Sequence, residues 1–189
     1  DNVYTIVGID PGNNLGIGIL HIDTVTNNIV GIESQTIVLD RYVDDGTYNV
    51  MLSRLVKLRE VINGLHCYYN PLAIGLEAAF MNSRFPKSVI QLSQYVATIE
   101  LSSRISNPWC RIFKYAPKYI KAAVGATGKA DKDSMRENLY KIPEIANLID
   151  LSLLSEHAID SLSMAYVTYK ELIINPHYMY TLPFSVILE

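Results

Sequence analysis

The succession of apolar segments and turn residues constrains the fold of this chain most strongly. Residues 3–9 form a β-branched run, residues 10–14 have the composition of a turn, and residues 16–22 are apolar again, a pattern that predicts a β-hairpin. Residues 26–28 supply a second turn before residues 29–39, which are rich in Ile, Val and Thr. We therefore expect the chain to begin with three antiparallel strands.

Helical and strand patterns alternate after these strands. Residues 48–68 carry apolar side chains at helical spacing, which predicts an amphipathic helix that ends near Asn63-Gly64 or shortly after. A second helix is expected over residues 88–105, with short strands at residues 72–76 and 111–115. This order predicts an α/β protein with a five-stranded mixed sheet, in which parallel strands are added to the three antiparallel ones and helices flank the sheet.

The last third of the chain is predicted to be helical. Pro117 suits the first position of a short helix that runs to Val124, and Asp131 suits the N-cap of a helix that runs to about Tyr140. A final helix is expected over residues 155–174. With 189 residues and no linker-like segment, the chain is expected to form one domain over residues 1–189.

Composition places the chain among soluble globular proteins. It has 49% hydrophobic and 19% charged residues, and no stretch approaches the roughly 20 apolar residues that span a bilayer, so no membrane partner is expected. Cys67 and Cys110 lack the spacing of a zinc site and are interpreted as thiols. The first residues lack a signal-peptide pattern, so we expect a cytoplasmic protein.

Four side chains that can bind a metal stand at informative positions. Asp10 and Glu77 each follow an apolar run, and a carboxylate there is expected at a strand end, because burying it costs several kcal/mol. His157 and Asp160 are three residues apart in a predicted helix, so they share one face of it. If the two strands are neighbours in the sheet, the four groups converge.

Each of these residues also has a structural interpretation. Asp10 could belong to a plain turn, since Asp, Pro and Gly are common turn residues. Glu77 could form a salt bridge with Lys87 or Arg84, and His157 could simply start a helix. Asp160 is harder to explain in this way because the residues around it are apolar.

The set of four matches the needs of two-metal phosphodiester hydrolysis. Two cations roughly 3.5–4 Å apart stabilise the attacking and the leaving oxygen, and Mg²⁺ prefers carboxylate oxygens. Mn²⁺ is a suitable substitute because it tolerates an imidazole ligand better. His157 is therefore either a metal ligand or a general base, and no small-molecule cofactor besides metal is expected.

Charge is distributed unevenly along the chain. The formal net charge is −3, but residues 80–141 hold 11 Lys and Arg against 4 Asp and Glu, a net charge of +7. Such a basic band is either an ordinary solvated face or, next to a carboxylate cluster, a surface for a polyanion.

Several motifs together resemble the RuvC-type Holliday junction resolvases. They are residues 6–12 with Gly16 and Gly18, residues 76–81, residues 116–125 and residues 157–165, which occur in the family's order and cover nearly the whole chain. Many family members have Asp where this chain has His157, although a histidine variant exists. The resemblance implies an RNase H-like fold, a homodimer packed largely through the helix after Glu77, and paired Mg²⁺-dependent nicks in branched DNA of a bacterial or phage-infected cell. The apolar side of the helix predicted over residues 88–105 is the expected dimer interface.

The resemblance also assigns roles to individual residues. It implies that Asp10, Glu77, His157 and Asp160 are the catalytic and metal-binding residues. The residues expected to contact DNA are Phe80, Arg84, Lys87, Lys118, Lys121, Lys129 and Lys132.

Three other functions remain open from the sequence. A nuclease that acts on RNA:DNA hybrids would share the fold and the metals. An actin-like nucleotide-binding module also begins with a strand and an acidic turn, but it needs a second lobe that a chain of 189 residues lacks. A binding module without catalysis is disfavoured by the complete set of four metal-capable groups.

Overall fold

A mixed β-sheet forms the centre of the computed structural model, which describes residues 2–42, 49–78, 86–126 and 132–174. The strand order is β3-β2-β1-β4-β5. The strands are β1 (Val3–Asp10), β2 (Asn14–Asp23), β3 (Ile29–Val38), β4 (Ala73–Glu77) and β5 (Arg111–Tyr115). The first three pair antiparallel, and β4 and β5 are added to β1 in parallel. The predicted α/β fold with a five-stranded mixed sheet is confirmed.

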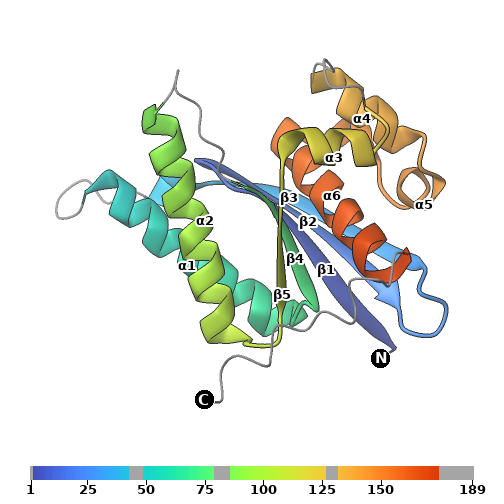
Figure 1. Ribbon diagram of the computed structural model, residues 1–189, viewed down its shortest axis with the longest axis horizontal. Helices are drawn as coiled ribbons and strands as arrows, with labels where there is room; N and C mark the ends of the chain where they lie inside the picture. The colour runs from blue at the N-terminus through green and yellow to red at the C-terminus, as the bar shows by residue number, and fades with distance from the viewer. Residues whose placement is uncertain (1, 43–48, 79–85, 127–131, 175–189) are drawn as a thin grey trace.

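Helices cover both faces of the sheet (Figure 1). On one side lie α1 (Val50–Tyr69) and α2 (Pro86–Ser106); on the other lie α3 (Pro117–Ala123), α4 (Lys132–Tyr140), α5 (Pro143–Ala146) and α6 (Glu156–Tyr169). Short helical turns are η1 (Leu39–Tyr42), η2 (Leu151–Leu153) and the π-helical η3 (Lys170–Ile174). In the described part of the chain, no helix is long and apolar enough to cross a membrane.

The sheet separates two hydrophobic clusters. Ile6 of β1 packs with Leu162 and other residues of α6, whereas Val7 and Ile9 pack with residues of α1 and α2 such as Ile99. This alternation follows from the two-residue period of a strand, which sends successive side chains to opposite faces. The central strand β1 is therefore covered on both sides, and its carboxyl end is held between the two helical layers.

Helix α1 continues beyond its predicted end. It passes through Asn63 and Gly64 and ends at Tyr69, with Asn70 as a left-handed C-cap (φ 42°). Gly costs about 1 kcal/mol in a helix interior, but Leu65 lies one residue further on and is buried in the cluster under α1 and α2. Packing of this last stretch outweighs the local glycine signal.

The helix α5 and the turn η2 were not predicted. Pro143 opens α5, and both elements exist because Ile145 and Leu151 are fully buried against the α6 side of the sheet. Their short lengths carry no recognisable periodicity.

The apolar side of α2 that we expected to form a dimer interface lies inside the protein. Val96 and Ile99 are buried in the cluster under α1 and α2, so that expectation is wrong for this side of the helix. A different side of α2 faces outward, where Ile90, Leu101 and Ile105 are 62%, 64% and 67% exposed. Because both sides of the helix are apolar, periodicity alone does not identify the exposed one.

Candidate active site

Glycines allow α6 to lie directly on the sheet. A Cβ atom at Gly8 of β1 would overlap the main-chain oxygen of Ser161, and one at Gly16 of β2 would overlap that of His157. Only glycine permits this approach of helix and strand. The first turns of α6 are capped by Ser155, whose hydroxyl accepts a hydrogen bond from the Ala158 N–H at 3.1 Å. The N-terminus of α6 is thus fixed above the carboxyl ends of the central strands.

The two strand-end carboxylates are neighbours in register. In the parallel ladder Ile9 lies opposite Leu76, so Asp10 and Glu77 follow at the same level of β1 and β4. Asp10 comes two residues after Gly8, which faces α6, so its side chain points to the same side of the sheet. The prediction that these strands lie side by side is confirmed.

The N-terminus of α6 adds the histidine and the third carboxylate. His157 Nδ1 is hydrogen-bonded to Asp10 Oδ2 at 2.7 Å, and their side chains are 38% and 17% exposed. Asp160 lies one turn further along α6 and is half-buried. A helix N-terminus favours negative charge, which suits a cluster of carboxylates at this position.

Electrostatic repulsion links the three carboxylates. Burial, together with repulsion from Asp10 and Asp160, raises the pKa of Glu77 to about 7. Burial and repulsion from Asp10 and Glu156 raise the pKa of Asp160 to about 6. Burial raises the pKa of Asp10 as well, although the hydrogen bond from His157 opposes the shift. The protein alone therefore stabilises these negative charges poorly.

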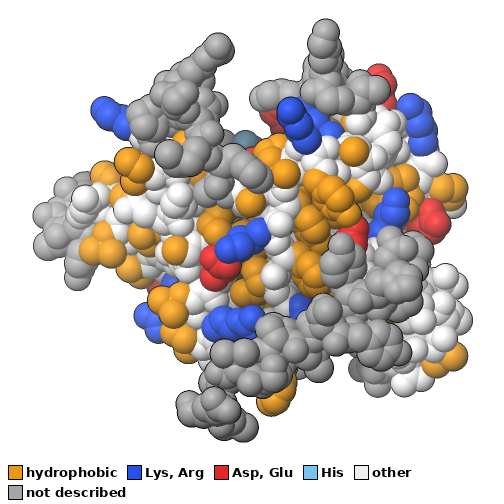
Figure 2. Space-filling view, viewed as in Figure 1, with side chains coloured by type: hydrophobic (Ala, Val, Ile, Leu, Met, Phe, Trp, Pro, Cys, Tyr) orange, Lys and Arg blue, Asp and Glu red, His pale blue; other side chains and the backbone are white. Residues whose placement is uncertain are grey.

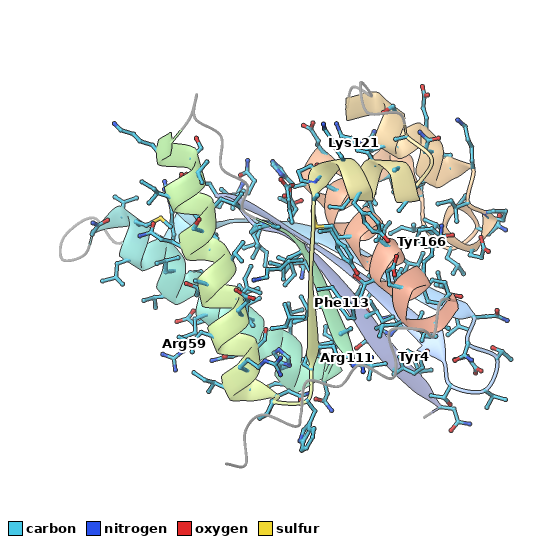
Figure 3. All side chains as sticks on the ribbon, viewed as in Figure 1. Tyr4, Arg59, Arg111, Phe113, Lys121 and Tyr166 are labelled. Atoms are coloured by element: carbon cyan, nitrogen blue, oxygen red, sulfur yellow. The ribbon has the colours of Figure 1, made fainter. Side chains whose placement is uncertain are left out.

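Lys121 adds positive charge near this cluster, in addition to His157. Its charge lowers the pKa of both Glu77 and Asp160, against the larger effects that raise them. The side chain is half-buried on α3, and Figure 3 shows it at the end of the sheet where α6 begins, far from Arg111 at the start of β5. The alternative of a salt bridge between Glu77 and Lys87 is not supported, because the cation that acts on Glu77 is Lys121. Arg84 lies outside the described residues.

The chemistry of the four groups fits a hard divalent cation. Three carboxylates and one imidazole are the ligand types for Mg²⁺ or Mn²⁺, and burial together with nearby acidic groups raises the pKa of all three carboxylates. In the side-chain orientations of the described residues, no three such groups stand close enough to hold an ion. One oxygen of Asp10, Oδ2, is turned toward His157.

Other predicted DNA contacts are distributed over several elements. Lys87 is exposed at the start of α2 and Lys118 is exposed on α3. Three predicted contacts, Phe80, Arg84 and Lys129, lie outside the described residues, as does the side chain of Lys132. In Figure 2 the Lys and Arg side chains are scattered over this face with apolar surface between them. The described Lys and Arg residues of the basic band therefore do not form one continuous patch on the visible face.

Two parts of the site escaped the sequence analysis. Glu156 adds negative charge that raises the pKa of Asp10 and of Asp160. Its position next to His157 is the sequence feature that could have identified it. The second part consists of Gln91 and Tyr95 of α2, which line a pocket of about 300 Å³ together with Asp10 and His157. Nothing in the local sequence connects these α2 residues with Asp10.

Comparison with known proteins decides the family. The family model described as "Crossover junction endodeoxyribonuclease RuvC" matches residues 6–167. The chain belongs to the RuvC family. Similar curated relatives of that name come from Cytophaga hutchinsonii, 32% identical over 87% of this chain and 75% of the relative, and from a Wolbachia strain of Drosophila simulans, 27% identical over 85% and 90%. RuvC proteins are metal-dependent endonucleases, which hydrolyse phosphodiester bonds.

Solved structures show that the fold is shared. Thermus thermophilus RuvC superimposes with a TM-score of 0.66 at 16% identity, covering 89% of this chain and 95% of that one. A yeast mitochondrial Holliday junction resolvase superimposes with a TM-score of 0.60 at 14% identity, covering 93% and 83%. The RNase H-like architecture that the sequence implied is confirmed by these matches. A further structure of the Thermus protein holds a Holliday junction substrate.

Proposed function

We propose that this RuvC-family chain resolves four-way DNA junctions by Mg²⁺-dependent hydrolysis, with Asp10, Glu77, His157 and Asp160 as the catalytic set. One observation carries the proposal: the ends of β1 and β4 and the first turns of α6 bring these four groups to one place, with raised carboxylate pKa values. Perturbed pKa values of this kind cluster at functional sites. The junction-bound Thermus relative supports branched DNA as the substrate.

The protein's own residues have distinct roles in this proposal. The carboxylates of Asp10, Glu77 and Asp160 would bind and orient two divalent cations in each active site. When bound, divalent cations supply Lewis-acid stabilisation of the attacking and leaving oxygens, and Mn²⁺ can replace Mg²⁺. The positive charge of Lys121 lowers the pKa of Glu77 and Asp160, so a larger fraction of both carboxylates is ionised at neutral pH.

His157 has two candidate roles. Its Nδ1 is engaged with Asp10, which orients the ring and leaves Nε2 to bind a cation or to accept a proton from the attacking water. In either role the hydrogen bond to Asp10 fixes the imidazole relative to the carboxylates.

We also propose that the active form is a homodimer. Two symmetric nicks in one junction need two active sites, and a two-fold dimer supplies them. The outward side of α2 is the candidate interface, since Ile90, Leu101 and Ile105 lie there at helical spacing and are exposed. Sedimentation of the protein with and without junction DNA tests this, and a monomer under both conditions at micromolar concentration would exclude the dimer.

The substrate is tested by direct competition between nucleic acids. A labelled four-way junction, a linear duplex of the same arms and an RNA:DNA hybrid are incubated with the protein, in Mg²⁺ and in EDTA. We expect paired cuts in the junction in Mg²⁺ alone, with the linear duplex left intact. Cleavage of the hybrid in preference to the junction would assign the chain to the alternative, a hybrid-specific nuclease.

A further inference from the structure

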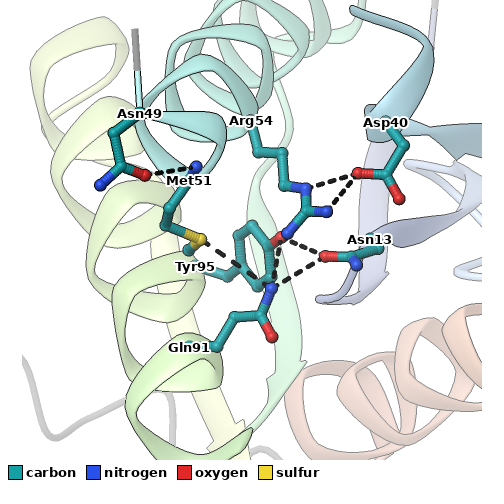
Figure 4. Close-up of polar contacts among 7 residues, drawn as sticks. All are labelled: Asn13, Asp40, Asn49, Met51, Arg54, Gln91 and Tyr95. Atoms are coloured by element: carbon teal, nitrogen blue, oxygen red, sulfur yellow. Dashed lines mark hydrogen bonds and ion pairs between the residues drawn. The ribbon is translucent and has the colours of Figure 1, made fainter. Parts of the chain in front are cut away.

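A partly buried polar contact holds the turn that follows Asp10. Asn13 is in the β1–β2 connection, and its side-chain oxygen accepts a hydrogen bond from the Tyr95 hydroxyl at 2.5 Å and another from Gln91 Nε2 at 3.0 Å (Figure 4). Both donors are on α2. A single amide oxygen therefore ties the turn beside Asp10 to the helix on the opposite layer.

The donor side of this contact is rigid. Tyr95 is only 2% exposed, within the core cluster under α1 and α2. Arg54 of α1 lies beside the Tyr95 hydroxyl and forms an ion pair with Asp40 at 2.5 Å. A hydroxyl held in this way cannot move without unpacking the core, so its position defines that of Asn13.

The turn is also held through its main chain, because Leu39 N–H donates to the Asn13 carbonyl at 2.8 Å and Leu39 is buried in the same cluster as Tyr95. Toward α2 it borders the pocket of about 300 Å³ that Asp10 and His157 also line. The hydrogen bonds to Asn13 cross this open region and keep the turn from moving into it.

The contact restrains the turn that directly follows Asp10, a proposed metal ligand. Asn13 is in the connection between β1 and β2, three residues beyond Asp10, and both donors are on α2. Displacements of about 1 Å at such a ligand reduce rates on the order of a hundredfold.

We propose that Tyr95 and Gln91 are positioning residues, which act through Asn13 to hold Asp10 in register with Glu77 for cation binding. This inference rests on the proposed function, because it assumes that Asp10 is a metal ligand. In this proposal Tyr95, Gln91 and Asn13 do not contact the reacting atoms. They orient Asp10, which does.

The test compares two Tyr→Phe variants, each of which removes one hydroxyl group. Tyr95→Phe removes the donor to Asn13. Tyr69→Phe is the matched control, because Tyr69 of α1 is partly buried against the same cluster and donates to a side chain, Glu33, at 2.8 Å, but at the other end of the sheet. Three quantities are measured for each full-length protein: Mn²⁺ binding without DNA by electron paramagnetic resonance, single-turnover junction cleavage across a Mg²⁺ series, and junction affinity in EDTA.

We expect Tyr95→Phe to weaken Mn²⁺ binding by about tenfold, as is common for groups that orient metal ligands. The Mg²⁺ concentration for half-maximal cleavage should rise in parallel, while junction affinity in EDTA stays unchanged. Tyr69→Phe should match the wild type in all three measurements. Equal behaviour of the two variants would overturn the inference and leave the Tyr95 hydroxyl as an ordinary core hydrogen bond.

Asn13→Ala keeps the experiment decisive if Tyr95→Phe does not fold, since Asn13 lies in a half-buried turn. It should show the same metal defect, and the double variant should be no worse than the more impaired single variant, because both remove one contact. Fully additive defects would contradict the shared contact. Asp10→Asn separates the two proposals: if it binds Mn²⁺ and cleaves like the wild type, the proposed function itself fails.

Discussion

Each end of the sheet contains a histidine hydrogen-bonded to a carboxylate, yet the two pairs differ in their surroundings. At the carboxyl end of β1, His157 contacts Asp10 at 2.7 Å. At the opposite end, His21 contacts Glu33 at 2.8 Å, and the Tyr69 hydroxyl donates to the other carboxylate oxygen at 2.8 Å. Burial alone would raise the pKa of Glu33, but the bonds from Tyr69 and His21 lower it below its usual value.

The two pairs differ in how many acidic side chains share the nearby hydrogen-bond donors and positive charges. Glu33 has two donors of its own, whereas Asp10 shares its surroundings with Glu77, Asp160 and Glu156, and the carboxylate pKa values rise. A satisfied pair stabilises the fold, and a cluster that lacks positive charge is suited to bind it from solution. The same residue types thus suit a structural role at one end and, in the function that we propose, a chemical role at the other.

The largest expected difference in cleavage rate is between single variants that neutralise an acidic side chain at one end of the sheet and at the other. Asp10→Asn, Glu77→Gln and Asp160→Asn should each reduce junction cleavage by roughly a thousandfold or more, because each loses several kcal/mol of charge stabilisation. Glu33→Gln should stay within a few-fold of the wild type. Single-turnover rates at saturating enzyme measure both, with junction affinity in EDTA as the check on binding. Near-normal cleavage by Asp10→Asn would remove the distinction between the two ends.

The two histidines provide a second comparison. His157→Ala should reduce cleavage by roughly a hundredfold or more, in the range of general acid–base effects, while His21→Ala should have little effect on the rate. His157→Asp restores a metal ligand and should recover part of the Mg²⁺-dependent activity. If all of these variants cleave equally well, His157 has only a structural role.

Stability of the metal-free protein should depend on pH in opposite directions at the two ends. The pKa of Glu77 rises from 4.5 to about 7 on folding, so its contribution is fully present below about pH 4.5 and is lost as the pH rises through 7. The pKa of Glu33 is lowered, so its contribution is present above its usual pKa and is lost as the pH falls.

Thermal unfolding in EDTA across pH 4.5–7.5 measures these contributions. For a partly exposed group we discount the Glu77 effect to about 1 kcal/mol, or roughly 2–4 °C in a protein of this size. Glu77→Gln should remove that part of the decline, and Glu33→Gln should not. A wild-type decline that persists unchanged in Glu77→Gln would show that other groups cause it.

The smallest effects are expected from the lysines of α3. Lys118 is exposed, so Lys118→Ala should only reduce the slope of log affinity against log salt by about 0.9, the value for one phosphate contact on B-form DNA. Lys121 acts on Glu77 and Asp160, so Lys121→Ala should also slow cleavage at saturating enzyme. Identical profiles for the two variants would mean that the position of Lys121 beside the carboxylates has no functional consequence.

Local patterns in the sequence were sufficient to predict most of the fold and the positions of the four proposed site residues at strand ends and on one helix. Asp10 and Glu77 end apolar strands, and His157 and Asp160 share a helix face, so each can be found from its immediate neighbours. The strand β5 was predicted with the bounds that the structure has. The single missing condition, that β1 and β4 are adjacent, followed from the topology of α/β sheets.

Features that depend on distant contacts were not predictable in this way. The contact between Asn13 and Tyr95 joins residues 82 positions apart, and neither has a local pattern that marks it. Lys121 was expected to contact phosphate, and only the fold places it beside Glu77. The exposed side of α2 also depends on packing, because both of its sides carry apolar residues.

The central claim is that the cluster under the N-terminus of α6 is the metal site of this nuclease. The most direct test is an anomalous difference map from crystals of the protein grown or soaked with Mn²⁺. We expect Mn²⁺ peaks within ligand distance of Asp10, Glu77 and Asp160, with His157 beside them, and no peak at His21 and Glu33. A protein that cleaves junctions in Mn²⁺ but shows its peaks away from these four residues would contradict the account.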